Sequence, residues 1–95
     1  MGDVITVQDI AGFYTYSNAL GDVYRSISSI HENLRSGHDA IRQNWIDERV
    51  EAFSENFDTA SEYMWQLQVA ISNMQEFLSS AADTYSAAER QVSSL

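Results

Sequence analysis

The sequence predicts an all-α fold, an antiparallel hairpin of two long helices that pairs with a second hairpin into a dimeric four-helix bundle. Three observations support this prediction. Apolar residues recur in a heptad rhythm along both halves of the chain, only a few residues separate the two runs, and the 95 residues include no proline and four glycines. A chain of this length has room for one small domain, residues 1–95.

Helix one is expected over about residues 7–43. Thr6 is a suitable N-cap, and Asp9 three residues later resembles a capping box. From there, apolar residues occupy heptad positions a and d, with a partly aromatic flank at the next position, e. The a residues are Phe13, Leu20, Ile27, Leu34 and Ile41, the d residues are Tyr16, Val23, Ile30 and Gly37, and the flank is Tyr24, His31, His38 and Trp45. Gly37 falls on the expected contact line, where a missing side chain lets another helix approach, whereas Gly21 falls on the outer side without a packing reason.

The heptad register breaks between Ile41 and Val50, which places a turn at about residues 44–47. Asn44 and Asp47 are both good N-cap residues for the helix that follows. A turn this short forces the two helices to run antiparallel.

Helix two, over about residues 48–93, carries the longest unbroken pattern. Its a and d positions are Val50, Phe53, Phe57, Ala60, Met64, Leu67, Ile71, Met74, Leu78, Ala81, Tyr85, Ala88, Val92 and Leu95, and Tyr63, Ala70 and Phe77 widen the stripe at g. A single hairpin buries one line of contact, so stripes this wide call for a second hairpin. We expect the interface between hairpins to use mid-helix residues, namely Ile27, Leu34, Met64, Ile71 and Met74.

The composition narrows the range of partners. A net charge of −9 argues against nucleic acid and against stable binding to or insertion into membranes, because both kinds of surface favour basic proteins. The absence of cysteine excludes disulfides and thiolate metal sites. No signal peptide and no apolar run of transmembrane length is recognisable, so export would have to be leaderless.

Few residues suggest a metal site or a catalytic site. His31 and His38 could be metal ligands, but seven helical residues separate them by about 10 Å, so one ion could not bind both without further ligands. We favour two semi-polar residues at the edge of the helix contact. The carboxylates are spread along solvent faces, and neither a nucleophile elbow nor a phosphate loop occurs. We therefore expect no enzyme activity, no catalytic residue, no cofactor and no metal.

Trp65 and Val69 lie four residues apart outside the apolar stripe, on a face that also carries Glu62 and Glu76. Single exposed apolar residues are ordinary. A tryptophan paired with a valine at helical spacing is nevertheless a possible partner-binding patch, because tryptophan is enriched in binding hot spots.

Several motifs together resemble the WXG family, the early-secreted-antigen-like proteins of about 100 residues that bacterial type VII secretion systems export. The resemblance spans almost the whole chain. It rests on two long helices, on Trp45 in the turn between them, and on the Tyr85-x-x-x-Glu89 pattern near the C-terminus. The family's Trp-x-Gly is Trp45-Ile46-Asp47 here; aspartate tolerates the positive φ that glycine permits and can also cap a helix.

The resemblance implies a bacterial, virulence-associated protein that is made in the cytoplasm and secreted without a cleaved leader. It also implies pairing with itself or with a paralogous hairpin, recognition by a membrane-bound secretion ATPase, and a non-enzymatic role as effector, chaperone or adaptor. The resemblance further implies that Trp45 and Asp47 form the turn motif and that Tyr85 and Glu89 act as a secretion signal. The alternative is a cytosolic coiled-coil adaptor or assembly protein that is not secreted. A membrane-active role is opposed by the net charge.

Overall fold

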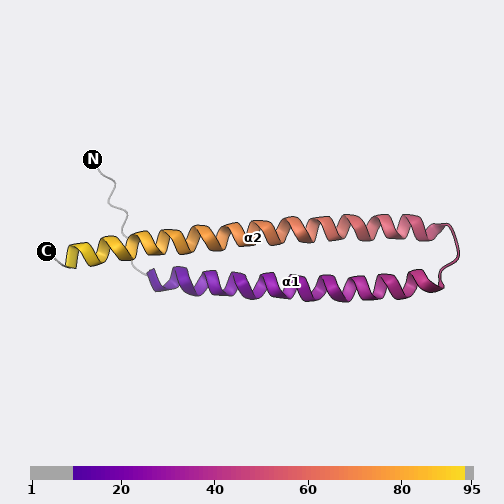
Figure 1. Ribbon diagram of the computed structural model, residues 1–95, viewed down its shortest axis with the longest axis horizontal. Helices are drawn as coiled ribbons and strands as arrows, with labels where there is room; N and C mark the ends of the chain where they lie inside the picture. Colours follow the sequence, from indigo (N-terminus) through magenta and orange to yellow (C-terminus); the bar gives the residue numbers. More distant parts are fainter. Residues whose placement is uncertain (1–9, 94–95) are drawn as a thin grey trace.

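A computed structural model describes residues 10–93, and these residues form two helices (Figure 1). Helix α1 spans Ile10–Asn44 and α2 spans Arg49–Ser93. They lie side by side and antiparallel, in a hairpin 74 × 25 × 14 Å in extent (Figure 1). The all-helical hairpin predicted from the sequence is confirmed. The predicted start of helix one near residue 7 and its Thr6 cap lie outside the described residues.

The contact line between α1 and α2, hereafter the seam, uses the heptad positions a and e. Leu20 and Ile27, at a positions of α1, are buried, and so are Ser17 and His38 at e positions. Opposite them, Ile71 is 5% exposed and packs with Leu20 and Ile27 into a small apolar core, with Met64 and Leu78 against it. Most of the large residues at d positions are exposed outside the seam, namely Tyr16, Val23, Ile30, Leu67 and Met74, whereas Phe53 near the turn stacks on His38.

Hydrogen bonds between the helices line the e side of the seam. Gln75 Nε2 donates to the backbone oxygen of Ser17 over 2.9 Å, and Gln68 Nε2 donates to the Tyr24 oxygen over 3.2 Å and to Ser28 Oγ over 2.7 Å. Nearer the turn, His31 Nε2 pairs with Ser61 Oγ and His38 Nε2 with Ser54 Oγ, both over 3.0 Å. The bonds made by Gln75, His31 and His38 satisfy polar groups that the contact partly or fully removes from water, whereas those of Gln68 lie at exposed positions.

The two glycines play the reverse of their expected roles. Gly21, assigned to the outer side, is buried, and a Cβ there would lie 2.9 Å from Gln75 Nε2. Its missing side chain therefore leaves room for the amide that crosses the seam. Gly37, expected in the helix contact, is exposed, with no heavy atom within 4 Å of where a Cβ would be. Within the hairpin, Gly37 lies outside the helix contact because the seam turns toward e, away from d.

Candidate interaction surfaces

An exposed apolar surface of the hairpin lies on the side opposite the hydrogen-bonded edge. Because α1 and α2 run antiparallel and both use a and e in the seam, their d and g positions face the same side. Large side chains on this side, hereafter the open apolar face, are each 45% to 75% exposed; they are Tyr16, Val23, Ile30, Tyr63, Leu67, Met74 and Phe77. Seven large apolar side chains exposed on one side make this face a candidate contact surface.

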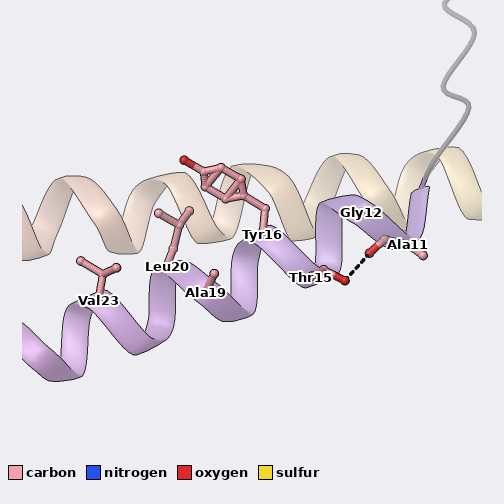
Figure 2. Close-up of a pocket in the computed structure, with 7 residues that line it drawn as sticks. All are labelled: Ala11, Gly12, Thr15, Tyr16, Ala19, Leu20 and Val23. Carbon is pink, nitrogen blue, oxygen red and sulfur yellow. Dashed lines mark hydrogen bonds between the residues drawn. The ribbon is translucent and has the colours of Figure 1, made fainter.

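A shallow groove runs along the α1 part of this face, where several small residues leave room. Figure 2 shows Tyr16, Leu20 and Val23 rising from one side of α1, with Ala19 between them. Gly12 also lines the groove. The groove is apolar, with no charged residue in its lining, so it suits aliphatic or aromatic side chains.

The five residues assigned to the interface between hairpins divide into two groups. Ile27 and Ile71 are 8% and 5% exposed, buried between the two helices of one hairpin, and Met64 packs beside them. Leu34 and Met74 are 46% and 45% exposed and accessible to a partner. The assignment of an interface stays a prediction, and in this structure Leu34 and Met74 are the members with free surface. The sequence analysis did not assign Ile30 and the g residues to this interface, although the shared side of the d and g positions could have done so.

The turn brings Trp45 onto the start of α2. Its ring centroid lies 5.5 Å from that of Phe53 at an interplanar angle of 43°, so the ring packs against the first turns of α2. The ring is partly exposed, and the next residue, Ile46, is 99% exposed. Together with Ile41, these residues line a hollow at the tip of the hairpin. The turn thus presents apolar surface from Ile46 as well as from Trp45.

Asp47 caps α2. Its Oδ1 accepts the backbone N–H of Arg49 over 2.9 Å, and its Oδ2 accepts the Arg49 guanidinium over 2.6 Å. The Arg49 side chain and then its backbone N–H hold the pKa of this carboxyl below its ordinary value of 3.8. No residue within 10–93 has a positive φ, so Asp47 replaces the family glycine as a cap without adopting glycine's conformation. Asn44, the other candidate cap, ends α1 and donates to the Ala40 oxygen.

At the opposite end, Tyr85 anchors the last paired turns. Its ring meets that of Phe13 edge-on, 6.1 Å between centroids and 74° between planes. Nearby, the Tyr14 hydroxyl donates to Asp83 Oδ1 over 2.5 Å, and this hydrogen bond raises the pKa of Tyr14. Glu89, one turn beyond Tyr85, is exposed near the end of α2 that projects past α1 (Figure 1).

The turn motif and the C-terminal motif are therefore at opposite ends of one hairpin. Trp45 and Glu89 are separated by most of the 74 Å length of the molecule. A single chain cannot join them into one surface, whereas an antiparallel pair of hairpins can.

Trp65 and Val69 are 60% and 40% exposed on the polar side of α2. Neither belongs to the open apolar face. Their role as a partner patch stays a prediction.

Asp39, His38 and Ser54 have the side-chain types of a hydrolase triad, but the geometry does not support catalysis. Asp39 Oδ1 is 3.5 Å from His38 Nδ1, which has no hydrogen-bond partner, and Ser54 is 6% exposed. Ser54 Oγ also receives a hydrogen bond from Arg42, and helix formation occupies the surrounding backbone N–H groups that an oxyanion would need. The cluster is a polar part of the seam.

Within residues 10–93, no group of three or more His, Cys, Asp or Glu side chains is placed to hold a metal ion. Neither described helix is apolar over a length sufficient to cross a membrane.

Comparison with known proteins identifies the family. No curated protein and no solved structure matches the chain. The model of the WXG100 family, proteins of 100 residues with WXG, matches residues 9–90, which include both helices almost entirely and the turn with Trp45. The chain belongs to the WXG100 family.

Proposed function

We propose that this protein is a small non-enzymatic substrate of a bacterial type VII secretion system, exported without a cleaved leader and acting as one half of a paired-hairpin effector, chaperone or adaptor. Membership of the WXG100 family over residues 9–90 is the observation that carries this proposal. The hairpin adds physical support, because its open apolar face is too large and too exposed for a protein that works alone.

Pairing through the open apolar face would complete a four-helix bundle. The hairpin's own core is small, with Leu20, Ile27, Ile71 and Ala82 as its buried apolar residues within 10–93. Covering Leu34 and Met74, together with their neighbours on the face, would add a second layer of core at roughly 25 cal/mol for each Å² of apolar surface removed from water. The partner in this proposal is a second copy or a paralogous hairpin.

Export would depend on a surface that exists only in the pair. In antiparallel hairpins, the turn of one chain lies beside the terminal segments of the other. Trp45 of one chain would then join Tyr85 and Glu89 of its partner. The exposed position of Glu89 and the partial exposure of Trp45 support this arrangement. The secretion ATPase would bind the composite surface and would not bind single hairpins.

The test compares bacteria that carry an active or an inactive secretion ATPase, with equal expression of this chain. The protein should accumulate in the culture supernatant only when the ATPase is active, while a cytosolic enzyme stays in the cells in both strains. Retention in the cells of both strains would favour the alternative, a cytosolic coiled-coil adaptor that uses the same apolar face.

A further inference from the structure

An exposed apolar site separate from the open apolar face lies on α2. It consists of Trp65 and Val69, which are 60% and 40% exposed and lie about one helical turn apart. They occupy heptad positions b and f, whereas the open apolar face uses d and g. A protein that covers the open apolar face therefore leaves this site accessible.

Positions b and f of α2 border the hydrogen-bonded edge of the seam. Ser79, at b, has its Oγ 3.3 Å from Ser17 Oγ of α1. Asp83, at f, accepts the Tyr14 hydroxyl of α1 over 2.5 Å. These contacts fix which side of α2 presents the two exposed apolar residues.

The carboxylates of α2 gather on the same side. Between Arg49 and Arg90, α2 contains seven acidic residues and no basic residue. Six of the seven occupy b or f positions; they are Glu51, Glu55, Asp58, Glu62, Glu76 and Asp83. In α1, by contrast, three acidic residues are balanced by three arginines. The excess negative charge of the two helices is thus concentrated on one side of α2.

The carboxylates nearest to Trp65 have no cationic partner. Glu51 and Asp83, at the two ends of the row, are bound by Arg42 and Tyr14 of α1. The carboxylates between these two ends are exposed and form no ion pair with any residue among 10–93; they are Glu55, Asp58, Glu62 and Glu76. Together with Trp65 and Val69, these four residues are hereafter the acidic stripe.

Like charges in the acidic stripe repel one another. Glu55, Asp58 and Glu62 are spaced by four residues or fewer, and side chains at spacings of three and four are neighbours on a helix. A cationic partner beside them would relieve this repulsion. Such a partner would bind the folded helix and would stabilise it.

We propose that the acidic stripe binds a basic amphipathic helix of another protein. An aliphatic side chain of that helix packs against Trp65 and Val69, and its lysine or arginine side chains lie beside Glu62 and Glu76. An aromatic centre with a charged rim is the usual composition of a specific interface. From Glu55 to Glu76 the stripe is about 32 Å long, which matches a partner helix of about 20 residues. This site depends neither on pairing through the open apolar face nor on export.

The charge of the stripe limits the kinds of partner that fit. Nucleic acid and anionic lipid surfaces are repelled by it. A second copy offers no basic helix, because the charges of α1 are balanced and the basic residues of α2 are Arg49 and Arg90, at its two ends. Within residues 10–93, no three carboxylates or histidines are placed to hold a metal ion. A positively charged protein segment is the partner that the stripe fits.

Three synthetic helix-forming peptides of about 20 residues test the proposal with the purified protein. The lysine peptide has two central leucines one turn apart and lysines at one-turn spacing on the same face. In the second peptide glutamates replace the lysines, and in the third alanines replace the leucines. After Trp45→Phe, Trp65 is the single tryptophan of the chain, so its emission reports contact at the site.

The lysine peptide should shift the Trp65 emission to shorter wavelength in a saturable way, and should bind more weakly as salt is raised. The alanine-substituted peptide should bind at least tenfold more weakly, and the glutamate peptide should leave the emission unchanged. Absence of binding by the lysine peptide at about 1 mM, or equal binding of the glutamate peptide, would overturn the proposal.

Trp65→Ala removes the apolar centre of the stripe and should weaken binding of the lysine peptide at least tenfold, measured by calorimetry. The ring is exposed, so helicity should be kept. The matched control is Tyr63→Ala, which removes a ring that is 66% exposed on the open apolar face, two residues away. If Tyr63→Ala weakens binding and Trp65→Ala does not, the peptide binds the open apolar face and the proposal is wrong.

A second pair of variants tests the carboxylates. Glu62→Lys places a like charge against the lysine peptide and should weaken binding at least tenfold. Glu48→Lys makes the same change in net charge about 20 Å away, beyond the range of screened interactions, and should have little effect. Equal weakening by both variants would show attraction by net charge alone and would exclude a site at Trp65.

Discussion

The imidazole of His38 lies flat against the ring of Phe57, with 4.3 Å between the ring centroids and 10° between the planes. Phe53 stacks on the same imidazole, with 5.5 Å between the ring centroids and 20° between the planes, and the ring of Trp45 packs on Phe53. An aromatic cluster thus fills the part of the seam next to the turn. It explains how a hairpin with so few buried aliphatic residues holds its turn end together.

We expect His38→Ala to lower the free energy of unfolding by about 3 kcal/mol, because the substitution removes a buried ring from this cluster and leaves a cavity. His38→Phe should cost less, about 1–2 kcal/mol, since it keeps the ring and removes the Nδ1 atom that has no hydrogen-bond partner but also loses the hydrogen bond between Nε2 and Ser54 Oγ. Urea unfolding followed by far-ultraviolet circular dichroism measures both. His31→Ala, at a half-buried site, is the matched control and should cost less than His38→Ala.

Ile71 belongs to the core of the hairpin and Met74 to its open apolar face, so substitutions at these two sites test the two layers of the proposed bundle separately. Ile71→Asp places an unpaired charge at a site that is 5% exposed, and should cost on the order of 4 kcal/mol and unfold the hairpin itself. Met74→Asp, at a site 45% exposed, should leave the helicity of a dilute hairpin intact and weaken pairing. Circular dichroism and light scattering distinguish these outcomes. Equal loss of helicity in both variants would show that the two layers are not separable.

Trp45→Ala should cost about 2 kcal/mol, less than for a fully buried tryptophan, because the ring packs on Phe53 from one side and remains partly exposed. Its emission should be at shorter wavelength than that of Trp65, which is 60% exposed, when each is the single tryptophan of the chain. Emission of the Trp45-only chain at the wavelength of free tryptophan would exclude the contact with Phe53.

The Asp47 cap gives a pH dependence of known sign. Arg49 holds the folded-state pKa of Asp47 below its ordinary value of 3.8, so the cap stabilises the fold above that value and is lost as the pH falls through the lower one. Asp47→Asn keeps a capping oxygen without the titration. The difference in unfolding free energy between the wild type and this variant should shrink between about pH 5 and about pH 2, measured at constant salt. A difference that grows on acidification would contradict the assignment.

The sequence predicted the two helices and the turn because heptad spacing and capping chemistry act locally. It did not predict the rotation of each helix about its axis. Positions d and e flank a almost symmetrically, so the stripe on α1 allowed a contact through Tyr16 as well as one through Ser17. The choice of Ser17 depends on Gln75 reaching its backbone oxygen past Gly21, a contact between residues 58 positions apart.

The unpredicted rotation of each helix about its axis also limits what the sequence could show of the candidate sites. Trp45 and the Tyr85–Glu89 pattern are local motifs, and the sequence locates them. That they lie at opposite ends of the hairpin follows from the antiparallel turn. The open apolar face could be recognised only after the seam was known, because Ile27 and Leu34 have the same heptad position and differ in burial.

The last prediction concerns export. Glu89 is exposed and Tyr85 is packed against Phe13, so the two residues of the C-terminal motif are not equivalent. Glu89→Ala should leave helicity and dimer mass unchanged, and a rise in helix propensity could even stabilise α2 slightly. If the ATPase recognises this carboxylate, secretion should fall at least tenfold while the amount of protein in the cells rises.

The control variant is Glu76→Ala, which removes an exposed carboxylate from the same helix outside both motifs and should be secreted normally. Tyr85→Phe keeps the edge contact with Phe13 and removes only the hydroxyl, so any loss of secretion in that variant reports recognition and not folding. Normal secretion of the double variant Glu89→Ala, Tyr85→Phe would show that the C-terminal motif is not the export signal. Trp45→Phe keeps an aromatic ring over Phe53. If this variant shows the same loss of secretion, the turn takes part in the same recognition step, which would support a surface assembled from two chains.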